Sequence, residues 1–231
     1  MNKSNKKFKI LLFVREECEQ SQKVSNYFNN ENFEVNIYFS KKMGEKLPEE
    51  VFHLNPDFLI SFRSLFIIPK RLLETVKLYS INFHPGPPKY PGSGSVNLAL
   101  YNDELHFGVT AHLINELIDN GEIIKTINFN VEKNDNVEKL LSKTHSHMFS
   151  LFTDVCENLF SKPDKYIEDQ LKINNDLFWN GKANRISKVD ELQKLDATIS
   201  NQELKRRLRS IHTKEFPLYT EINNHKFIIE D

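Results

Sequence analysis

Cysteine and glycine are scarce in this chain of 231 residues, which has two cysteines and seven glycines. Cys18 and Cys156 lie far apart and form no Cys-x-x-Cys pair, which argues against a disulfide framework or a zinc cluster and fits a reducing compartment. No Gly-x-Gly-x-x-Gly sequence follows the first apolar run. A dinucleotide cofactor in the usual place is therefore not expected.

Long hydrophobic runs and an excess of one charge are also absent. The first apolar run, residues 10–14, is too short for a signal peptide core or a membrane span. Net charge is −1, with basic and acidic residues interspersed, so nothing general favours binding to nucleic acid or an anionic membrane. We expect a cytoplasmic protein without nucleic-acid or membrane partners.

Apolar residues make up 39% of the chain and aromatic residues 11%, which argues against disorder. Short apolar or alternating runs typical of strands are interspersed with helical segments in the N-terminal half. The expected strands are 9–14, 33–39, 57–62 and 78–83, and the expected helices are 18–28 and 69–78. This order predicts an α/β fold with a Rossmann-like, mostly parallel sheet.

Two more strands are expected at 107–114 and 122–129, and a long amphipathic helix should begin near Asp135. Asp135 and Glu138 resemble a capping box, and an apolar stripe follows them. From Pro163 the sequence is polar and typical of loops. A helix at 201–211 and a hairpin of 218–222 and 226–229 then end the chain. We predict a catalytic domain at 1–174 and a C-terminal subdomain at 175–231.

Three polar residues lie beside turn-forming residues in this plan. Asn82 and His84 end the fourth strand before Pro85, and Asp119 precedes Asn120-Gly121. Taken singly, Asn82 and Asp119 are ordinary turn residues, and His84 is an ordinary loop histidine. Together they supply an amide donor, a base and a carboxylate, which suit transfer of an acyl group to an amine.

The segments around these residues carry a family resemblance. Residues 82–92 (Asn-Phe-His-Pro-Gly-Pro-Pro-Lys-Tyr-Pro-Gly) resemble the N-x-H-P…LP…G loop of the folate-dependent formyltransferases. Residues 107–114 and 119–124 resemble the same family's G-V-T-x-H…D-x-G-x-I block, in which His112 matches a histidine close to the site. The resemblance covers residues 8–130 well. It implies a Rossmann-like catalytic half that takes its formyl group from N10-formyltetrahydrofolate.

Two departures narrow the resemblance. Gly86-Pro87-Pro88 replaces the Ser-Leu-Leu-Pro of the methionyl-tRNA and purine-pathway members, and Pro91-Gly92 replaces the Arg-Gly of the tRNA enzymes. The C-terminal part is too short to be the tRNA-binding domain of the methionyl-tRNA enzymes. The purine-pathway enzymes normally end near the long helix and have no counterpart of this tail. A short tail that ends in a hairpin is similar to the sugar N-formyltransferases, which act on nucleotide-linked amino-dideoxy sugars for surface polysaccharides.

The resemblance also implies roles for particular residues. Asn82 would donate to the oxyanion and His84 would accept the amine proton, while Asp119 would orient His84 or relay the proton to the folate nitrogen. Apolar residues before the fourth strand match the pterin pocket, although plain core packing also explains them, and a later loop closes over that pocket. These folate-binding candidates are Leu65, Phe66, Ile67, Ile68, Asn115, Glu116 and Leu117.

The sequence identifies the residues that would contact the acceptor less clearly than those that would bind folate. Candidates beyond the catalytic loop are Lys89, Tyr90, Ser93 and Asn97, and Trp179 and Tyr219 are candidates for stacking on a nucleotide base or for simple packing. The favoured acceptor is TDP-4-amino-4,6-dideoxyglucose, followed by the 3-amino isomer. The alternatives are a glycinamide ribonucleotide or other small-amine formyltransferase, and a folate- or nucleotide-binding module without catalysis. No metal is expected, and the family suggests a homodimer formed through the long helix or the hairpin.

Overall fold

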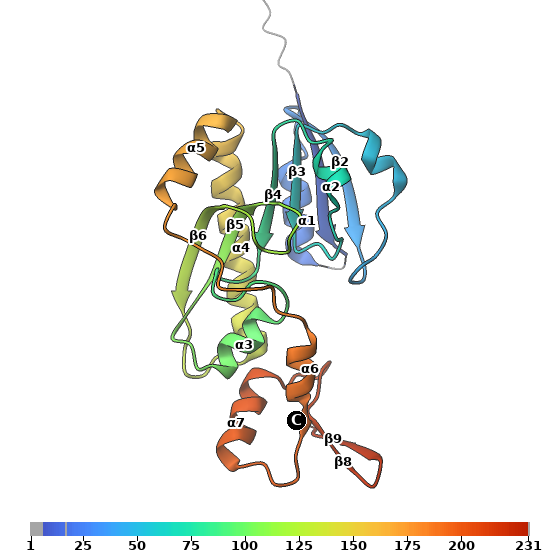
Figure 1. Ribbon diagram of the computed structural model, residues 1–231, viewed down its shortest axis with the longest axis vertical. Helices are drawn as coiled ribbons and strands as arrows, with labels where there is room; N and C mark the ends of the chain where they lie inside the picture. The colour runs from blue at the N-terminus through green and yellow to red at the C-terminus, as the bar shows by residue number, and fades with distance from the viewer. Residues whose placement is uncertain (1–6, 17, 231) are drawn as a thin grey trace, which may run out of the picture.

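A six-stranded sheet, in the order β2-β1-β3-β4-β5-β6, forms the centre of the molecule (Figure 1). The computed structural model describes residues 7–16 and 18–230. The first four strands are parallel, and the last two run antiparallel to their neighbours. They are β1 (Phe8–Arg15), β2 (Phe33–Ser40), β3 (Phe58–Phe62), β4 (Tyr79–His84), β5 (His106–Leu113) and β6 (Ile123–Asn130). The predicted α/β fold with a mostly parallel sheet is confirmed.

Helices cover both faces of this sheet. Leu12 and Ile60 belong to the core shared with α1 (Glu19–Tyr27), α4 (Val137–Leu159) and α5 (Pro163–Ile173). Leu11 and Leu59 face the opposite layer of η1 (Glu49–His53) and α2 (Lys70–Leu73). Because the central strands are buried on both faces, their sequences read as continuous apolar runs.

Two expected helices differ from the prediction. The cap of α4 is Asn136, whose side chain accepts a hydrogen bond from the Lys139 N–H at 3.0 Å, whereas Asp135 pairs with Lys143. The predicted helix 69–78 stops after Leu73, because the chain soon turns into β4. There the Lys77 and Leu78 N–H groups bond to the carbonyls of residues 56 and 57 instead.

Three helices were not predicted: α3 (Ser95–Tyr101), α5 and α6 (Ser187–Gln193). The expectation of loop after Pro163 is wrong, because Pro163 opens α5 at a position where a missing N–H costs nothing. The sequence of α5 is polar because only one face is buried, through Ile167.

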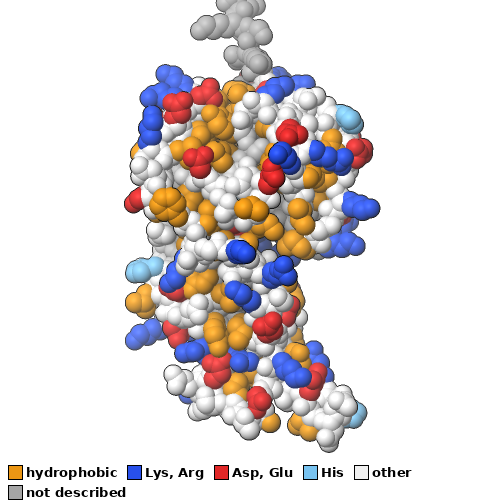
Figure 2. Space-filling view, in the orientation of Figure 1, with side chains coloured by type: hydrophobic (Ala, Val, Ile, Leu, Met, Phe, Trp, Pro, Cys, Tyr) orange, Lys and Arg blue, Asp and Glu red, His pale blue; other side chains and the backbone are white. Residues whose placement is uncertain are grey.

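The C-terminal elements form a second sheet, β7-β8-β9, beside α6 and α7 (Asn201–Ser210). The strands are β7 (Lys194–Leu195), β8 (Tyr219–Ile222) and β9 (His225–Ile228). The hairpin turn is as predicted, with Asn223 and Asn224 at φ of 50° and 64°. These elements have a hydrophobic cluster of their own and form the narrower end of the molecule (Figure 2). The boundary at 174 and 175 stays a prediction.

Candidate active site

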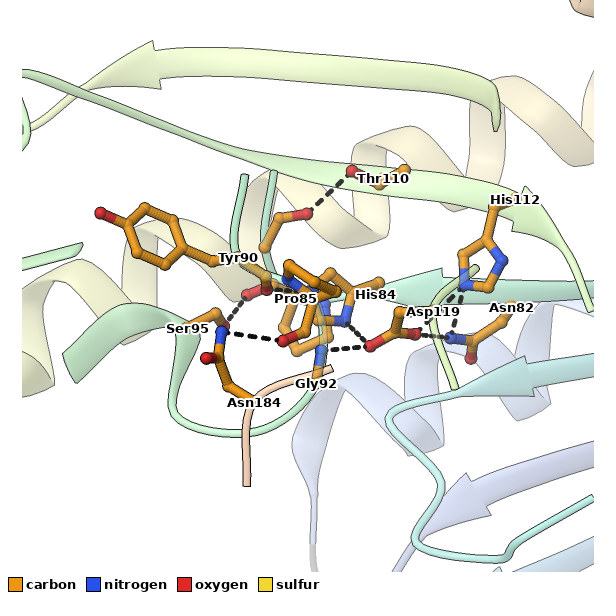
Figure 3. A network of polar contacts seen from close by, with 12 residues as sticks. Asn82, His84, Pro85, Tyr90, Gly92, Ser95, Thr110, His112, Asp119 and Asn184 are labelled. Carbon is orange, nitrogen blue, oxygen red and sulfur yellow. Dashed lines mark hydrogen bonds and ion pairs between the residues drawn. The ribbon is translucent and has the colours of Figure 1, made fainter. Parts of the chain in front are cut away.

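The end of β4 and the loop between β5 and β6 bring the three predicted catalytic residues together (Figure 3). Asn82 and His84 are two residues apart on β4, so their side chains lie on the same face of the strand. Asp119 reaches them from a turn in which its backbone adopts φ of 43°. The antiparallel pairing of β4 with β5 sets His112 opposite Asn82.

The Asp119 carboxylate is the hub of this cluster. Its Oδ2 lies 3.0 Å from His84 Nδ1 and accepts the Gly92 N–H at 2.7 Å. Its Oδ1 lies 3.3 Å from both Asn82 Nδ2 and His112 Nε2. Burial raises the pKa of the Asp119 carboxyl, but the neighbouring imidazoles outweigh it and hold that pKa well below its usual range. The side chain is therefore a buried anion that fixes four groups around it.

His84 has a hydrogen-bond acceptor at each ring nitrogen. Nδ1 faces Asp119, and Nε2 lies 2.9 Å from the backbone carbonyl of Tyr90. Since a neutral imidazole has only one N–H, this environment favours the imidazolium form. Burial lowers the pKa of His84, but the Asp119 charge and both hydrogen bonds raise it, and the net shift is upward. The ring is 3% exposed, so its charge is held inside the protein.

His112 completes the cluster and was not among the predicted catalytic residues. Its Nδ1 lies 2.7 Å from the Leu113 carbonyl, and its Nε2 lies 3.1 Å from Asn82 Nδ2 and 3.3 Å from Asp119 Oδ1. The Asn82 Nδ2 atom thus lies within hydrogen-bond distance of both His112 and Asp119. The signal for His112 in the sequence was its match to a family histidine close to the site, whereas its pairing with Asn82 comes from the structure.

The loop after His84 fits closely around the imidazole. A Cβ atom at Gly86 would lie 2.6 Å from His84 Nε2 and 2.9 Å from Ser95 Cβ, so no larger residue fits there without movement. Thr110 Oγ1 donates to the Gly86 carbonyl at 2.8 Å, and Ser95 Oγ donates to the Pro85 carbonyl at 2.9 Å. These bonds hold the loop against the end of β4.

A segment from the C-terminal part of the chain closes this loop from the other side. The N–H groups of Asn180 and Asn184 donate to the carbonyls of Pro88 and Pro91, at 2.9 and 2.8 Å. Trp179 Nε1 donates to the Gly121 carbonyl at 2.7 Å, and the indole ring lies edge-on to His84 and His112. Residues 179–184 are thus part of the site, a connection that the sequence did not show.

The predicted folate-binding residues lie on two loops linked by an ion pair. Lys70, just beyond residues 65–68, lies 2.8 Å from Glu116 of the loop that follows β5. Phe66 and Ile68 pack against the core, while Ile67 and Leu117 are exposed. Leu65 N–H donates to Ser40 Oγ, and Asn115 Oδ1 accepts the Leu117 N–H. Each loop exposes an apolar side chain, and the role of the two loops in folate binding stays a prediction.

The predicted acceptor residues are more dispersed. Tyr90 is buried, with its hydroxyl donating to Glu104, and Lys89 pairs with the same carboxylate. The Ser93 N–H donates to the Asn184 carbonyl, so it lies in the closed loop. Asn97 donates to the Ser210 carbonyl, and Tyr219 packs under Lys226 in the second sheet. Tyr90 and Trp179 thus contact the cluster around Asp119, whereas Asn97 and Tyr219 make the contacts described above with C-terminal elements.

Neither a metal site nor a membrane span is evident where the chain is described. Within residues 7–16 and 18–230, no three His, Cys, Asp or Glu side chains are arranged to hold a metal ion. Over the same residues, no helix has the length and apolar character needed to cross a bilayer.

Comparison with known proteins identifies relatives of this arrangement. The family model described as formyl transferase matches residues 9–156. A methionyl-tRNA formyltransferase of Ehrlichia chaffeensis is 26% identical over 191 residues, which are 82% of this chain and 59% of that protein. The chain therefore spans less than two thirds of that relative's length.

Two solved structures share the fold at near-full length. A 4-N formyltransferase from Francisella tularensis has a TM-score of 0.75 at 20% identity, with 96% of each chain covered. An N-formyltransferase from Helicobacter canadensis, in complex with folinic acid and dTDP-3-aminofucose, has a TM-score of 0.62 at 22% identity, with 94% of this chain and 85% of that chain covered.

Proposed function

Because the chain belongs to the formyl transferase family, we propose that it is an N-formyltransferase acting on a nucleotide-linked amino-dideoxy sugar. The donor is N10-formyltetrahydrofolate, and the favoured acceptor is TDP-4-amino-4,6-dideoxyglucose, for surface polysaccharide synthesis. The observation that carries this proposal is the buried cluster of Asn82, His84 and Asp119 at the end of β4. It combines an amide donor, a proton carrier and a fixed anion, which together suit acyl transfer to an amine.

The reaction follows from these groups. The lone pair of the acceptor amine attacks the formyl carbon, and the carbonyl π electrons move to oxygen to give a tetrahedral oxyanion. As this intermediate collapses, the bond to folate N10 breaks, N10 gains a proton and the amine nitrogen loses one. His84 gives its own proton to N10 and then accepts the proton that the amine nitrogen loses, while Asp119 holds the ring through Nδ1. Imidazole returns to its starting state, so the protons balance.

Asn82 supplies the oxyanion donor in this mechanism. Its Nδ2 atom lies 3.1 Å from His112 Nε2 and 3.3 Å from Asp119 Oδ1, and the second contact is longer than a usual hydrogen bond. A shorter bond from Nδ2 to a full oxyanion is charge-assisted and stronger than the long contact to Asp119. Exchanging the long contact to Asp119 for a bond to the oxyanion stabilises the transition state more than the resting site. Such preferential binding of the transition state is what accelerates a reaction.

The two loops joined by the Lys70–Glu116 ion pair suit the folate donor. Ile67 and Leu117 are 58% and 64% exposed, and exposed apolar side chains beside a catalytic cluster suit a flat aromatic ring. We propose that residues 65–68 and 115–117 hold the pterin.

The fold supports a sugar acceptor through its neighbours. The Francisella and Helicobacter structures match nearly all of this chain, and the latter holds a nucleotide-linked amino sugar. The Ehrlichia relative favours a second acceptor, methionyl-tRNA, but shares only 59% of its own length with this chain. A glycinamide ribonucleotide acceptor and a binding module without catalysis are the remaining alternatives. Homodimer formation stays a prediction.

The test is direct. The purified protein is incubated with N10-formyltetrahydrofolate and TDP-4-amino-4,6-dideoxyglucose, and the sugar nucleotide is weighed by mass spectrometry. The expected result is a gain of one CO unit that is lost in His84→Ala and reduced in Asn82→Ala. The 3-amino isomer, glycinamide ribonucleotide and methionyl-tRNA are run in parallel. Formylation of one of these alone reassigns the acceptor, and unchanged turnover in both variants refutes the mechanism.

A further inference from the structure

Trp179, the single tryptophan of the chain, contacts three parts of the catalytic cluster. Its ring centroid lies 5.6 Å from that of His84 and 4.9 Å from that of His112, and both contacts are edge-on, at 77° and 80°. Its Nε1 donates to the Gly121 carbonyl at 2.7 Å, two residues beyond Asp119. The indole therefore braces both imidazoles that flank the carboxylate and the turn that carries it.

The Gly121 position shows that the turn contacted by Trp179 is also packed tightly on its other side. A Cβ atom at that position would lie 1.8 Å from the Leu113 carbonyl oxygen, so the turn already packs against the end of β5. The Leu113 N–H in turn bonds to the Glu122 carbonyl at 2.9 Å. With the turn fixed on one side by β5 and on the other by the indole N–H, the Asp119 carboxylate has little freedom to move away from His84.

The backbone beside Trp179 is tied to the catalytic loop as well. Asn180 and Asn184 donate to the carbonyls of Pro88 and Pro91, and Asn184 pairs with Gly92 as a parallel bridge. Gly92 itself donates to Asp119 Oδ2. One short segment from beyond α5 thus supports both loops that meet at the carboxylate.

We propose that Trp179 is a positioning residue for formyl transfer. Its indole holds the His84 ring and the turn that carries Asp119 in a fixed position relative to each other. This inference rests on the function proposed above. It assigns the indole to the catalytic cluster itself rather than to a nucleotide base, and it gives the C-terminal part of the chain a direct role in the reaction.

The test compares Trp179→Leu, Trp179→Phe and the matched control Phe178→Leu, which changes an exposed aromatic residue in the same segment. We expect Trp179→Leu to lower kcat by about 10- to 100-fold, since small misplacements of reacting groups have effects of this size. The KM for the folate donor should stay nearly constant, and Trp179→Phe, which keeps an aromatic edge but loses the N–H, should be intermediate. Phe178→Leu should match the wild type.

Two readouts need no acceptor and separate this inference from the proposed function. NMR titration of the His84 ring should show a shifted midpoint in Trp179→Leu and Trp179→Phe but not in Phe178→Leu. In the protein with Trp179 intact, His84→Gln should brighten tryptophan emission, because a neighbouring imidazolium quenches indole fluorescence. An unmoved His84 titration in both Trp179 variants, or unchanged emission in His84→Gln, would overturn the proposal even if formyl transfer is confirmed.

Discussion

Replacing Asp119 with asparagine removes one charge from the centre of the site and keeps the shape of the side chain. The carboxylate is 7% exposed and lies 3.0 Å from His84 Nδ1, where two opposite charges attract by about 5 kcal/mol at an effective dielectric constant of about 20. Desolvation offsets much of this attraction in the intact pair. Removing one partner leaves the other charge buried alone, and we therefore expect a loss of about 3–5 kcal/mol in the free energy of unfolding.

The loss should depend on pH in a defined direction. The pKa of His84 is raised, so its contribution is fully present below its unfolded value of 6.5 and is lost as pH rises through the folded pKa. The pKa of Asp119 is lowered, so its contribution is present above its unfolded value of 3.8 and is lost as pH falls through the folded pKa. The destabilisation by Asp119→Asn should thus be largest between about pH 4 and 6.5 and smaller at pH 9.

Urea unfolding of the wild type and Asp119→Asn at several pH values measures this difference. Asp135→Asn is the matched control, because Asp135 is also buried but forms its ion pair with a lysine, Lys143, instead of a histidine. Its effect should be flat with pH. Formyl transfer by Asp119→Asn should fall by about 10⁴-fold, as in sites where an orienting aspartate is changed to asparagine. A destabilisation that is equal at pH 5.5 and pH 9 would refute the reasoning.

Three further predictions follow from the same geometry. Gly86→Ala should lower kcat by about 10- to 100-fold, because the new Cβ meets His84 Nε2; unchanged kcat in steady-state assays would show that the loop yields. A chain that ends at residue 174 should lose formyl transfer, because Trp179, Asn180 and Asn184 are removed; full activity of a folded truncation would contradict this and favour a small-amine acceptor. At saturating substrates kcat should fall as pH rises through the raised pKa of His84; a rising pH profile there would show that the neutral ring is the starting form.

The strands were predictable because buried strands consist of continuous apolar residues, which are visible in the sequence. Every residue of β3 is buried, so its apolar run has no competing interpretation. The short helices lack such a signal. The cap of α3 is Gly94 in the left-handed region, and α6 begins without a side-chain cap, so neither start carries the Ser, Thr, Asp or Asn that marks a helix in sequence. Only packing against the rest of the molecule specifies them.

The site was predictable where side chains carry it. Asn82, His84 and Asp119 meet as expected from their places at strand ends. The Tyr90 carbonyl and the Gly92 N–H complete the environment of His84 and Asp119, but backbone groups have no signature in sequence. Trp179 reaches the turn after Asp119 across 58 residues of sequence, along a path that depends on the tertiary fold.

In the proposed reaction, the hydrogen-bond acceptors around His84 would also set the order of proton transfers. An imidazolium cannot take a proton from the attacking amine, so the ring must first give one up, and the departing folate nitrogen is the group that needs it. Once C–N10 cleavage has made the ring neutral, it can accept the proton from the new amide nitrogen, which attack has made acidic. The Tyr90 carbonyl and Asp119 then stabilise the regenerated imidazolium. The buried positive charge of His84 also disfavours the ammonium form of the acceptor. The charge that keeps His84 from acting as a base before C–N10 cleavage thus also favours the neutral, nucleophilic form of the amine.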